Sequence, residues 1–545
     1  MKLIYKKTFC ALVSTAAFAL LFAQNNQNNN QNIELPEVTT VISAESDKVQ
    51  SDALPDFSDV LLSDSGSGEI NPVLPEVESS DNTELAQSHS AGAEKSVYAE
   101  GLLGGGYPTL FMGNISVFRN VGENPFRFSL SHDSAIGYAG HALTDNYSDR
   151  TTKIEIARSY KKNHFTWSAG GFYQTAANGL QGNLISDGKE ISQLNRDSYN
   201  ANGKIGYEFS NGFFIDFAAN FDFYNRFSDV SCRAIPTFSY LDIEPALKVG
   251  WKGHGFETGI SAEYSYGYGK ETSYLPFENG HRAQFTANLS WKNDFVHFYG
   301  NAAAVIGNQI DEKPVIVPFT IGFESLFPVY FANRRVAISA EGGIKSYKPQ
   351  LYELEEKFKF AQINQNPSET SDWYGKFGLK IPLKTAFTGS ANLEYYKTAY
   401  DNGVWEADYS EDLSGLYFIY KNEHELLITD FSLSYSYEFF TITGGWRSNW
   451  KDIPVLENRQ AIHLAINLQD EEVRWGIMLD YNMAINNTLE TPVLNLETFI
   501  RLTKSVRLVI SVNDLIKLYK AENRIYAGNY AARGGSATML LKFFF

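Results

Sequence analysis

Cysteine is nearly absent from this chain of 545 residues, which carries only Cys10 and Cys232. Cys10 lies in the N-terminal segment that we expect to be removed, so Cys232 is the single cysteine of the mature chain. A single cysteine excludes an intramolecular disulfide and any metal site built from a cysteine pair. Cys232 stands between two strand-like segments, and we predict that it is a free thiol in a loop.

Basic residues are scarce as well, with 46 Lys and Arg against 63 Asp and Glu and a formal net charge of -17. This acidic balance excludes nucleic acid as a partner, because binding to phosphates needs clustered basic side chains. The acidic residues are concentrated between residues 24 and 90, where thirteen Asp and Glu accompany one basic residue, Lys48. Most of the negative net charge therefore belongs to this one segment.

Catalytic and metal-binding motifs are missing from the sequence. There is no Gly-x-Ser-x-Gly motif, and the nine histidines are scattered along the chain. His254, His281 and His297 lack the i, i+4 or cysteine-paired spacing of a metal site, so we expect histidines on the surface or in loops. We predict that the protein is not an enzyme, with no catalytic residue, no cofactor and no bound metal.

One glycine-rich run, residues 102–107, suggests a phosphate-binding loop at first sight. It lacks the Gly-Lys-Ser/Thr ending that such a loop needs, and it sits in a strand-like segment. We interpret the run as a bend in the first strand of the fold, where glycine relieves crowding.

The N-terminus has the order of a secretory signal. Three lysines within Met1–Lys7 precede the apolar run Phe9–Phe22, and the small residue Ala23 follows. The apolar run is shorter than the roughly 20 residues of a membrane-spanning helix. We therefore predict a signal peptide over residues 1–23 and export of the chain. Cys10 precedes the apolar run, which argues against a lipoprotein.

Residues 24–95 are acidic, rich in Asn, Gln, Ser and Pro, and contain Phe57 as their only aromatic residue. Such a segment buries too little apolar surface to offset the entropy of ordering, so we predict a disordered periplasmic segment. Leu-Pro-Glu-Val occurs in it twice, at Leu35–Val38 and Leu74–Val77. The first copy is either a recognition peptide that adds a strand to a partner's sheet or simply repeated linker composition.

From residue 96 onward the composition changes to aromatic residues in strict alternation with polar ones. Phe213–Tyr224 has an apolar face of Phe, Ile and Ala and an opposite face with Asp and Asn. Runs of ten or more residues suit a tilted strand that crosses a bilayer. Turn signals such as Asn211-Gly212 and Lys252-Gly253 divide the region into segments of roughly 20 residues. We predict an all-β fold, a large antiparallel transmembrane β-barrel of about 22 strands over residues 96–545.

The last strand carries an apolar face that ends in phenylalanine, the mark by which bacterial outer-membrane barrels are recognised for assembly. The residues of this predicted assembly signal are Met539, Leu541, Phe543 and Phe545. Together with the signal peptide and the long alternating runs, it predicts a protein of the bacterial outer membrane. Its expected partners are outer-membrane lipid and the barrel-assembly machinery.

Two stretches resemble the barrel of TonB-dependent outer-membrane receptors. The segment Val512–Leu515, followed by Tyr519, Tyr526, Gly528 and Arg533-Gly534, is similar to that family's C-terminal pattern of Asn-Leu, Tyr, Gly-Arg and a final Phe. The segment Asn366–Ser371 resembles the Pro-Glu-x-Ser stretch that opens a late barrel strand. The resemblance implies a receptor-sized barrel, and neither motif is catalytic.

The N-terminal region departs from that family. Its members carry a globular plug before the barrel, and residues 24–95 are too short and too acidic for one. A short peptide nevertheless resembles the energy-coupling peptide that such receptors present to TonB. Its residues are Leu35, Pro36, Glu37, Val38, Thr39, Thr40, Val41 and Ile42. The resemblance therefore implies contact with TonB, or with another periplasmic protein, through the acidic segment, while the barrel needs another means of occlusion.

Two functions remain open. The first is solute transport through the barrel, and the alternative is a structural or surface-interaction barrel whose loops bind a partner. A wide, polar lumen favours the first, and a filled lumen favours the second. Under the barrel prediction, charged residues on the polar strand faces line the lumen, namely Asp216, Asp222, Glu257, Glu263 and Lys292. The tyrosines at 264, 266 and 268 are typical of a girdle at the membrane interface.

Overall fold

The structure, a computed structural model, describes most of the chain from Val97 to Phe544. It leaves out residues 120–123, 139–140, 142–145, 187–188, 230–234, 236, 271–278, 309–314, 330–333, 364–366, 385, 410–415, 471 and 487. The predicted signal peptide, the acidic segment with Leu35–Ile42, Cys232 and Phe545 therefore lie outside the described residues.

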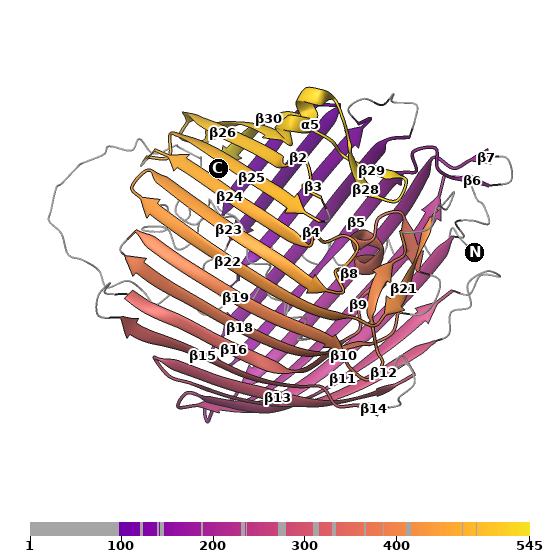
Figure 1. The fold of residues 1–545 in the computed structure, drawn as a ribbon. Helices are drawn as coiled ribbons and strands as arrows, with labels where there is room; N and C mark the ends of the chain where they lie inside the picture. The colour runs from indigo at the N-terminus through magenta and orange to yellow at the C-terminus, as the bar shows by residue number, and fades with distance from the viewer. Residues whose placement is uncertain are drawn as a thin grey trace, which may run out of the picture. The chain divides into compact units, whose positions relative to one another are not determined.

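The described residues form one large sheet of 23 strands and three small sheets of two or three strands. In the large sheet, the two-residue strand β14 (Val315–Ile316) pairs only with the end of β13. The other 22 strands pair antiparallel with their neighbours in the chain, and the last pairs with the first, so the sheet closes into a barrel (Figure 1). This confirms the predicted fold class and strand number. The strands are β1 (Tyr98–Tyr107), β2 (Leu110–Arg119), β3 (Phe126–Ile136), β4 (Ser148–Lys162), β5 (Phe165–Gly179), β8 (Gln193–Glu208), β9 (Phe213–Ser228), β10 (Phe238–Gly253), β11 (Phe256–Gly269), β12 (Gly280–Lys292), β13 (Val296–Gly307), β15 (Phe319–Val329), β16 (Arg334–Tyr347), β18 (Thr370–Lys384), β19 (Phe387–Thr398), β22 (Glu425–Tyr437), β23 (Phe440–Lys451), β24 (Gln460–Gln469), β25 (Trp475–Ile485), β26 (Val493–Thr503), β27 (Val506–Asn513) and β30 (Ser536–Phe544).

Alternation sets the two faces of the barrel wall. On β9 the large apolar residues Phe213, Phe217 and Phe221 are exposed on the outside, whereas Asp222 is buried on the inner face. An outward apolar face and an inward polar face are what a barrel wall between lipid and water requires. On β30, Met539 and Leu541 are exposed on the outer face, and Phe543 follows in the same alternation.

The two ends of the barrel differ in their connections. One end, called here the turn end, has short connections, and β1 begins and β30 ends there. The other, called the long-loop end, carries the small elements β6 (Ile185–Ser186), β7 (Lys189–Glu190), β14, α4 (Leu351–Lys357), β17 (Ala361–Ile363), β20 (Val404–Ala407), β21 (Tyr417–Asn422), α5 (Leu515–Lys520), β28 (Arg524–Ala527) and β29 (Tyr530–Ala532). Within the described ranges, no helix is long and apolar enough to cross a membrane.

The turn predictions were accurate to within about two residues. Asn211-Gly212 does lie between β8 and β9, and Gly212 has a φ of 84°. Lys252-Gly253 instead ends β10, and the turn is made by His254 and Gly255, with φ values of 54° and 79°. The tight turn needs two consecutive residues of positive φ, and the Lys-Gly pair is still in the ladder.

Glycine is needed where the barrel closes. Gly104 and Gly106 on β1 lie against β30, where a Cβ at Gly106 would stand 1.9 Å from the Ala537 carbonyl oxygen. A Cβ at Gly104 would stand 2.1 Å from the carbonyl oxygen of Met539. The crowding expected for residues 102–107 is thus present, while the pairing of β1 with β2 and β30 continues through the run without a register shift.

Candidate functional site

Five long connections meet in one hydrophobic cluster at the long-loop end, called here the loop core. They are the connections β5–β8, β9–β10, β16–β18, β19–β22 and β27–β30. Its larger buried members are Leu180, Leu184, Ile191, Ile235, Phe238, Leu351, Leu354, Phe358, Phe360, Ile363, Trp405, Tyr409, Leu416, Tyr417, Ile419 and Tyr530. The connections are therefore packed as one body.

Strand pairing and ring stacking join these connections to one another. β17 pairs parallel with β21, which also pairs with β20, so the β16–β18 and β19–β22 connections share a small sheet. The Phe360 ring stacks on that of Tyr530 with centroids 4.0 Å apart. Gly528 has a φ of 53° and lies so close to Tyr417 that a Cβ would be 2.0 Å from its hydroxyl. Gly528, part of the receptor-like C-terminal pattern, thus serves the packing of the loops.

The β16–β18 connection enters the lumen. Helix α4 brings the Tyr352 ring to 5.8 Å from Phe172, which lies on the inner face of β5 and well below its end at Gly179. The amide of Gln174, also on that face, donates to Glu356 at 3.2 Å. In Figure 1 the helix α4, which has no label, is the coiled ribbon drawn between the labels of β8 and β21. The helix therefore fills part of the lumen at this end.

A buried carboxylate fixes α4 to the wall. Glu355 is fully buried and accepts hydrogen bonds from the Arg226 guanidinium and the Tyr224 hydroxyl. It also accepts from the Ile363 amide at 3.1 Å, and Arg196 Nε lies 3.8 Å from Glu355 Oε2. We call Glu355, Arg226, Tyr224 and Arg196 the Glu355 cluster. It joins the helix to two neighbouring wall strands, β8 and β9.

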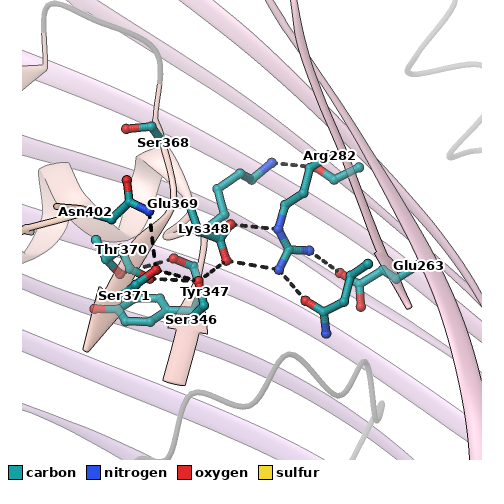
Figure 2. Close-up of polar contacts among 12 residues, drawn as sticks. Glu263, Arg282, Ser346, Tyr347, Lys348, Ser368, Glu369, Thr370, Ser371 and Asn402 are labelled. Atoms are coloured by element: carbon teal, nitrogen blue, oxygen red, sulfur yellow. Dashed lines mark hydrogen bonds and ion pairs between the residues drawn. The ribbon is translucent and has the colours of Figure 1, made fainter. Parts of the chain in front are cut away.

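A second buried carboxylate fixes the other end of the same connection (Figure 2). Glu369 is fully buried and receives two hydrogen bonds from Arg282 of β12, with Nε to Oε2 at 2.7 Å and Nη2 to Oε1 at 3.2 Å. Arg282 Nη1 also pairs with Glu263 at 3.1 Å, and Ser346 donates to Glu369 at 2.7 Å. A bidentate guanidinium–carboxylate pair fixes orientation as well as distance.

The Pro-Glu-x-Ser segment thus has a structural role. It leads directly into β18, which begins at Thr370, as the resemblance implied. Its glutamate, Glu369, reaches across the lumen side of the wall to a strand four positions away in the barrel order.

A lysine holds the first residues of the connection. Lys348 follows β16, and its ammonium pairs with Asp242 of β10 and donates to Ser265 of β11 at 2.6 Å. It also lies 3.7 Å from Glu244. Lys348 and Arg282 together supply positive charge to the carboxylates on this part of the inner wall. Lys348 at the start of the β16–β18 connection and Glu369 at its end are thus both held by ion pairs.

Arg533 of the receptor-like pattern ties the β27–β30 connection to β3 and β4. Its Nε donates to Asp149 at 2.9 Å, and its guanidinium also pairs with Asp133. Tyr138 donates to Asp149 at 2.7 Å. Burial, together with the Asp149 carboxylate, raises the pKa of Tyr138, so its hydroxyl stays protonated and remains a donor.

The inner wall below the loops is polar, as predicted. Asp216 pairs with Lys204 at 3.1 Å, and Asn200 donates to Asp222 at 2.8 Å. Glu257 lies 3.7 Å from Lys248. All five charged residues expected to face the lumen, Lys292 and Glu263 included, lie on the inner face by alternation. The lumen is thus polar along its wall and filled by loops at one end.

The histidine expectation holds for two of the three residues. His254 is in a turn, and His281, although it lies in β12, is exposed. His297 of β13 departs from the expectation, because it is half-buried on the inner face with its Nδ1 3.2 Å from Glu324. An inward strand position accepts a histidine when a carboxylate is opposite, a contact that no local spacing reveals. Among the described residues, no group of three His, Cys, Asp or Glu could hold a metal.

Sequence comparisons find no match, either to a protein-family model or to a curated protein. Solved structures of similar fold exist. The ferric enterobactin receptor PfeA from Pseudomonas aeruginosa has a TM-score of 0.60 at 10% identity, covering 84% of this chain and 81% of that one. The FrpB iron transporter from Neisseria meningitidis reaches 0.61 at 10% identity over 84% and 83% of the two chains. The copper transporter OprC reaches 0.57 at 11% identity over 83% and 80%. At such identity the likeness establishes the fold: this chain has the closed barrel that its motifs predicted.

Proposed function

We propose that this protein is a transport barrel of the bacterial outer membrane, closed at its long-loop end by its own loops. The position of α4 carries the proposal, because the helix lies in the lumen and is held there by buried ion pairs. A barrel of 22 strands has a lumen wide enough that natural transporters fill it with a plug. The polar inner wall suits a water-filled passage, and the loop core supplies an obstruction that a passage needs.

Orientation follows from the unequal ends. Outer-membrane barrels place short turns in the periplasm and long loops outside the cell. The loop core would then face the exterior, and the start of β1 would face the periplasm, where the acidic segment is predicted to be.

Replacing residues 349–368 with a short Gly-Ser linker tests the proposal. The purified full chain in planar bilayers should be mostly silent, whereas the linker variant should conduct in discrete steps. Replacing the turn-end residues Glu438 and Phe439 in the same way should leave the barrel silent. Each variant is measured with and without residues 24–95, so that obstruction by the acidic segment is recognised. A folded linker variant that stays silent in both forms would refute closure by the loops.

Metal complexes are the first solutes to test. The three similar structures are named as a ferric enterobactin receptor, an iron transporter and a copper transporter. Their likeness to this barrel supports transport, and uptake of iron or copper complexes by cells with and without the protein would identify the solute.

We further propose that Leu35–Ile42 contacts TonB and couples transport to energy. The similarity of this peptide to the family's coupling peptide supports it. Deleting only these eight residues should abolish capture of the chain by a TonB C-terminal domain while leaving the heat-modifiable barrel intact. Capture that survives the deletion would reject this contact.

The alternative, a barrel that binds a partner at the cell surface, is favoured by two observations. The first is that loops fill the lumen at one end, and the second is a pair of exposed apolar residues. Tyr519 on α5 and Ile525 on β28 are 91% and 82% exposed at the long-loop end. Both residues lie on the β27–β30 connection, and exposed apolar surface can mark an interaction site where it forms one patch. If a Tyr519→Ser, Ile525→Ser double variant loses adhesion of whole cells but keeps solute uptake, the two functions coexist.

A further inference from the structure

Two arginines stand directly opposite each other inside the barrel. Arg196 of β8 is the register partner of Arg226 of β9, and both side chains are on the inner face. Arg196 is 4% exposed and Arg226 is fully buried. Like charges at directly opposite positions of a sheet repel, and burial strengthens that repulsion. Such a pair needs negative charge close to both guanidinium groups.

The described residues around the pair supply one negative charge. Glu355 accepts from Arg226 Nη1 and lies within ion-pair distance of Arg196, while Arg196 Nη1 donates to the neutral Asn178 at 2.6 Å. Two cations and one anion leave one positive charge in excess. The Nε and Nη2 groups of both arginines are buried and have no hydrogen-bond acceptor.

The described surroundings offset this charge only in part. The Phe238 ring lies 5.6 Å from the Arg226 guanidinium carbon, a cation–π contact that attracts the cation but supplies no negative charge, and the pair lies beneath the loop core. Buried cations that are neither paired nor hydrogen-bonded are strongly unfavourable, so unused donors of this kind point to a missing acceptor. Four nitrogens without an acceptor, which together carry six N–H bonds, lie on the guanidiniums of register partners and are candidate donors to an anion.

We propose that Arg196 and Arg226 bind a small monovalent anion, with chloride as the natural occupant. One negative charge neutralises the excess, and a spherical ion accepts from several N–H donors without a fixed geometry. Both arginines are buried, which favours a small ion over a larger organic anion. The ion is the second negative member of the Glu355 cluster, and with it the two wall strands and α4 are held together. The inference is independent of which solute the barrel transports.

Bromide replaces chloride and can be located directly. Crystals of the full chain grown in sodium bromide should give an anomalous peak between the Arg196 and Arg226 guanidiniums. A water molecule there with no anomalous signal would overturn the proposal. This measurement uses the unaltered protein and does not depend on how a variant folds.

Stability provides the second measurement. In detergent at equal ionic strength, the heat-modifiable form should convert at a lower temperature in sodium gluconate than in sodium chloride or bromide. Arg196→Gln removes the excess charge, so its conversion temperature should be the same in all three salts. The control Arg533→Gln removes an arginine that already has two carboxylate partners, and it should keep the halide dependence. Equal behaviour of the unaltered chain in all salts, or halide dependence surviving in Arg196→Gln, would refute the site.

Discussion

Replacing Glu355 with alanine should release α4 from the barrel wall. The substitution removes the only carboxylate that the described residues place between Arg196 and Arg226, and with it the acceptor of the Tyr224 and Ile363 hydrogen bonds. Breaking a buried ion pair by removing one partner costs about 3–5 kcal/mol, mainly because the remaining charge stays buried. At roughly 1.4 kcal/mol for each factor of ten, the ratio of docked to released helix should fall on the order of a hundred- to several-thousand-fold.

Single-channel recording in planar bilayers measures this change. The unaltered barrel should show rare openings, and Glu355→Ala should raise the open probability strongly at unchanged unit conductance. Glu356→Ala is the matched control, since Glu356 is the next residue of α4, is exposed and has one hydrogen bond, from Gln174. An exposed substitution of this kind alters stability by less than about 0.5 kcal/mol, so its open probability should stay close to that of the unaltered chain.

Two results would refute the reasoning. If Glu355→Ala is folded and as silent as the unaltered barrel, packing of the loop core alone keeps the lumen closed. If Glu356→Ala opens the barrel as much as Glu355→Ala does, the opening reflects general damage to α4 and not the loss of the buried carboxylate.

Three further predictions concern assembly. Gly106→Ala should destabilise barrel closure by about 1–3 kcal/mol through overpacking against Ala537. The control Gly444→Ala has open space at its Cβ and should not destabilise the barrel. The temperature of the heat-modifiable transition should therefore fall in the first variant and stay unchanged in the second. Arg533→Gln should leave the barrel closed but make the β27–β30 connection more susceptible to proteolysis, because Asp149 loses its charged partner; unchanged cleavage would count against that role. Removing residues 24–95 should leave the heat-modifiable band intact, and its loss would show that the acidic segment is needed for assembly.

The strands and their faces could be read from the sequence because lipid and water impose the pattern locally. Along Phe213–Phe221 the odd-numbered residues face outward and the even-numbered residues face inward, so alternation records the side of each residue without reference to distant residues. The structure extends this strand to Ser228, past the clean alternation. In this additional part of the strand, Arg226 contacts Glu355 of α4 and does not face open lumen. Its environment is therefore set by a distant loop.

The loop core and its ion pairs could not be predicted in the same way. Glu355 meets Arg226 from 129 positions away, and Glu369 meets Arg282 from 87 positions away. Helix α4 has only seven residues, too few for a periodic signal. The sequence does contain one indication: Arg226 interrupts the aromatic end of a strand, and an arginine at such a position needs a buried acid from elsewhere in the chain.

The chemistry of these contacts fits the proposed closure by loops, which has to be reversible if the barrel transports a solute. A buried ion pair gains little net stability over an apolar contact of the same volume, because desolvation cancels much of the attraction between the charges. It does, however, accept only one arrangement of its partners, since a displaced Glu355 would leave two guanidiniums unpaired. The β16–β18 connection is held by three such contacts, through Lys348, Glu355 and Glu369, and each ends on a different part of the wall. A connection held in this way therefore has a single docked position.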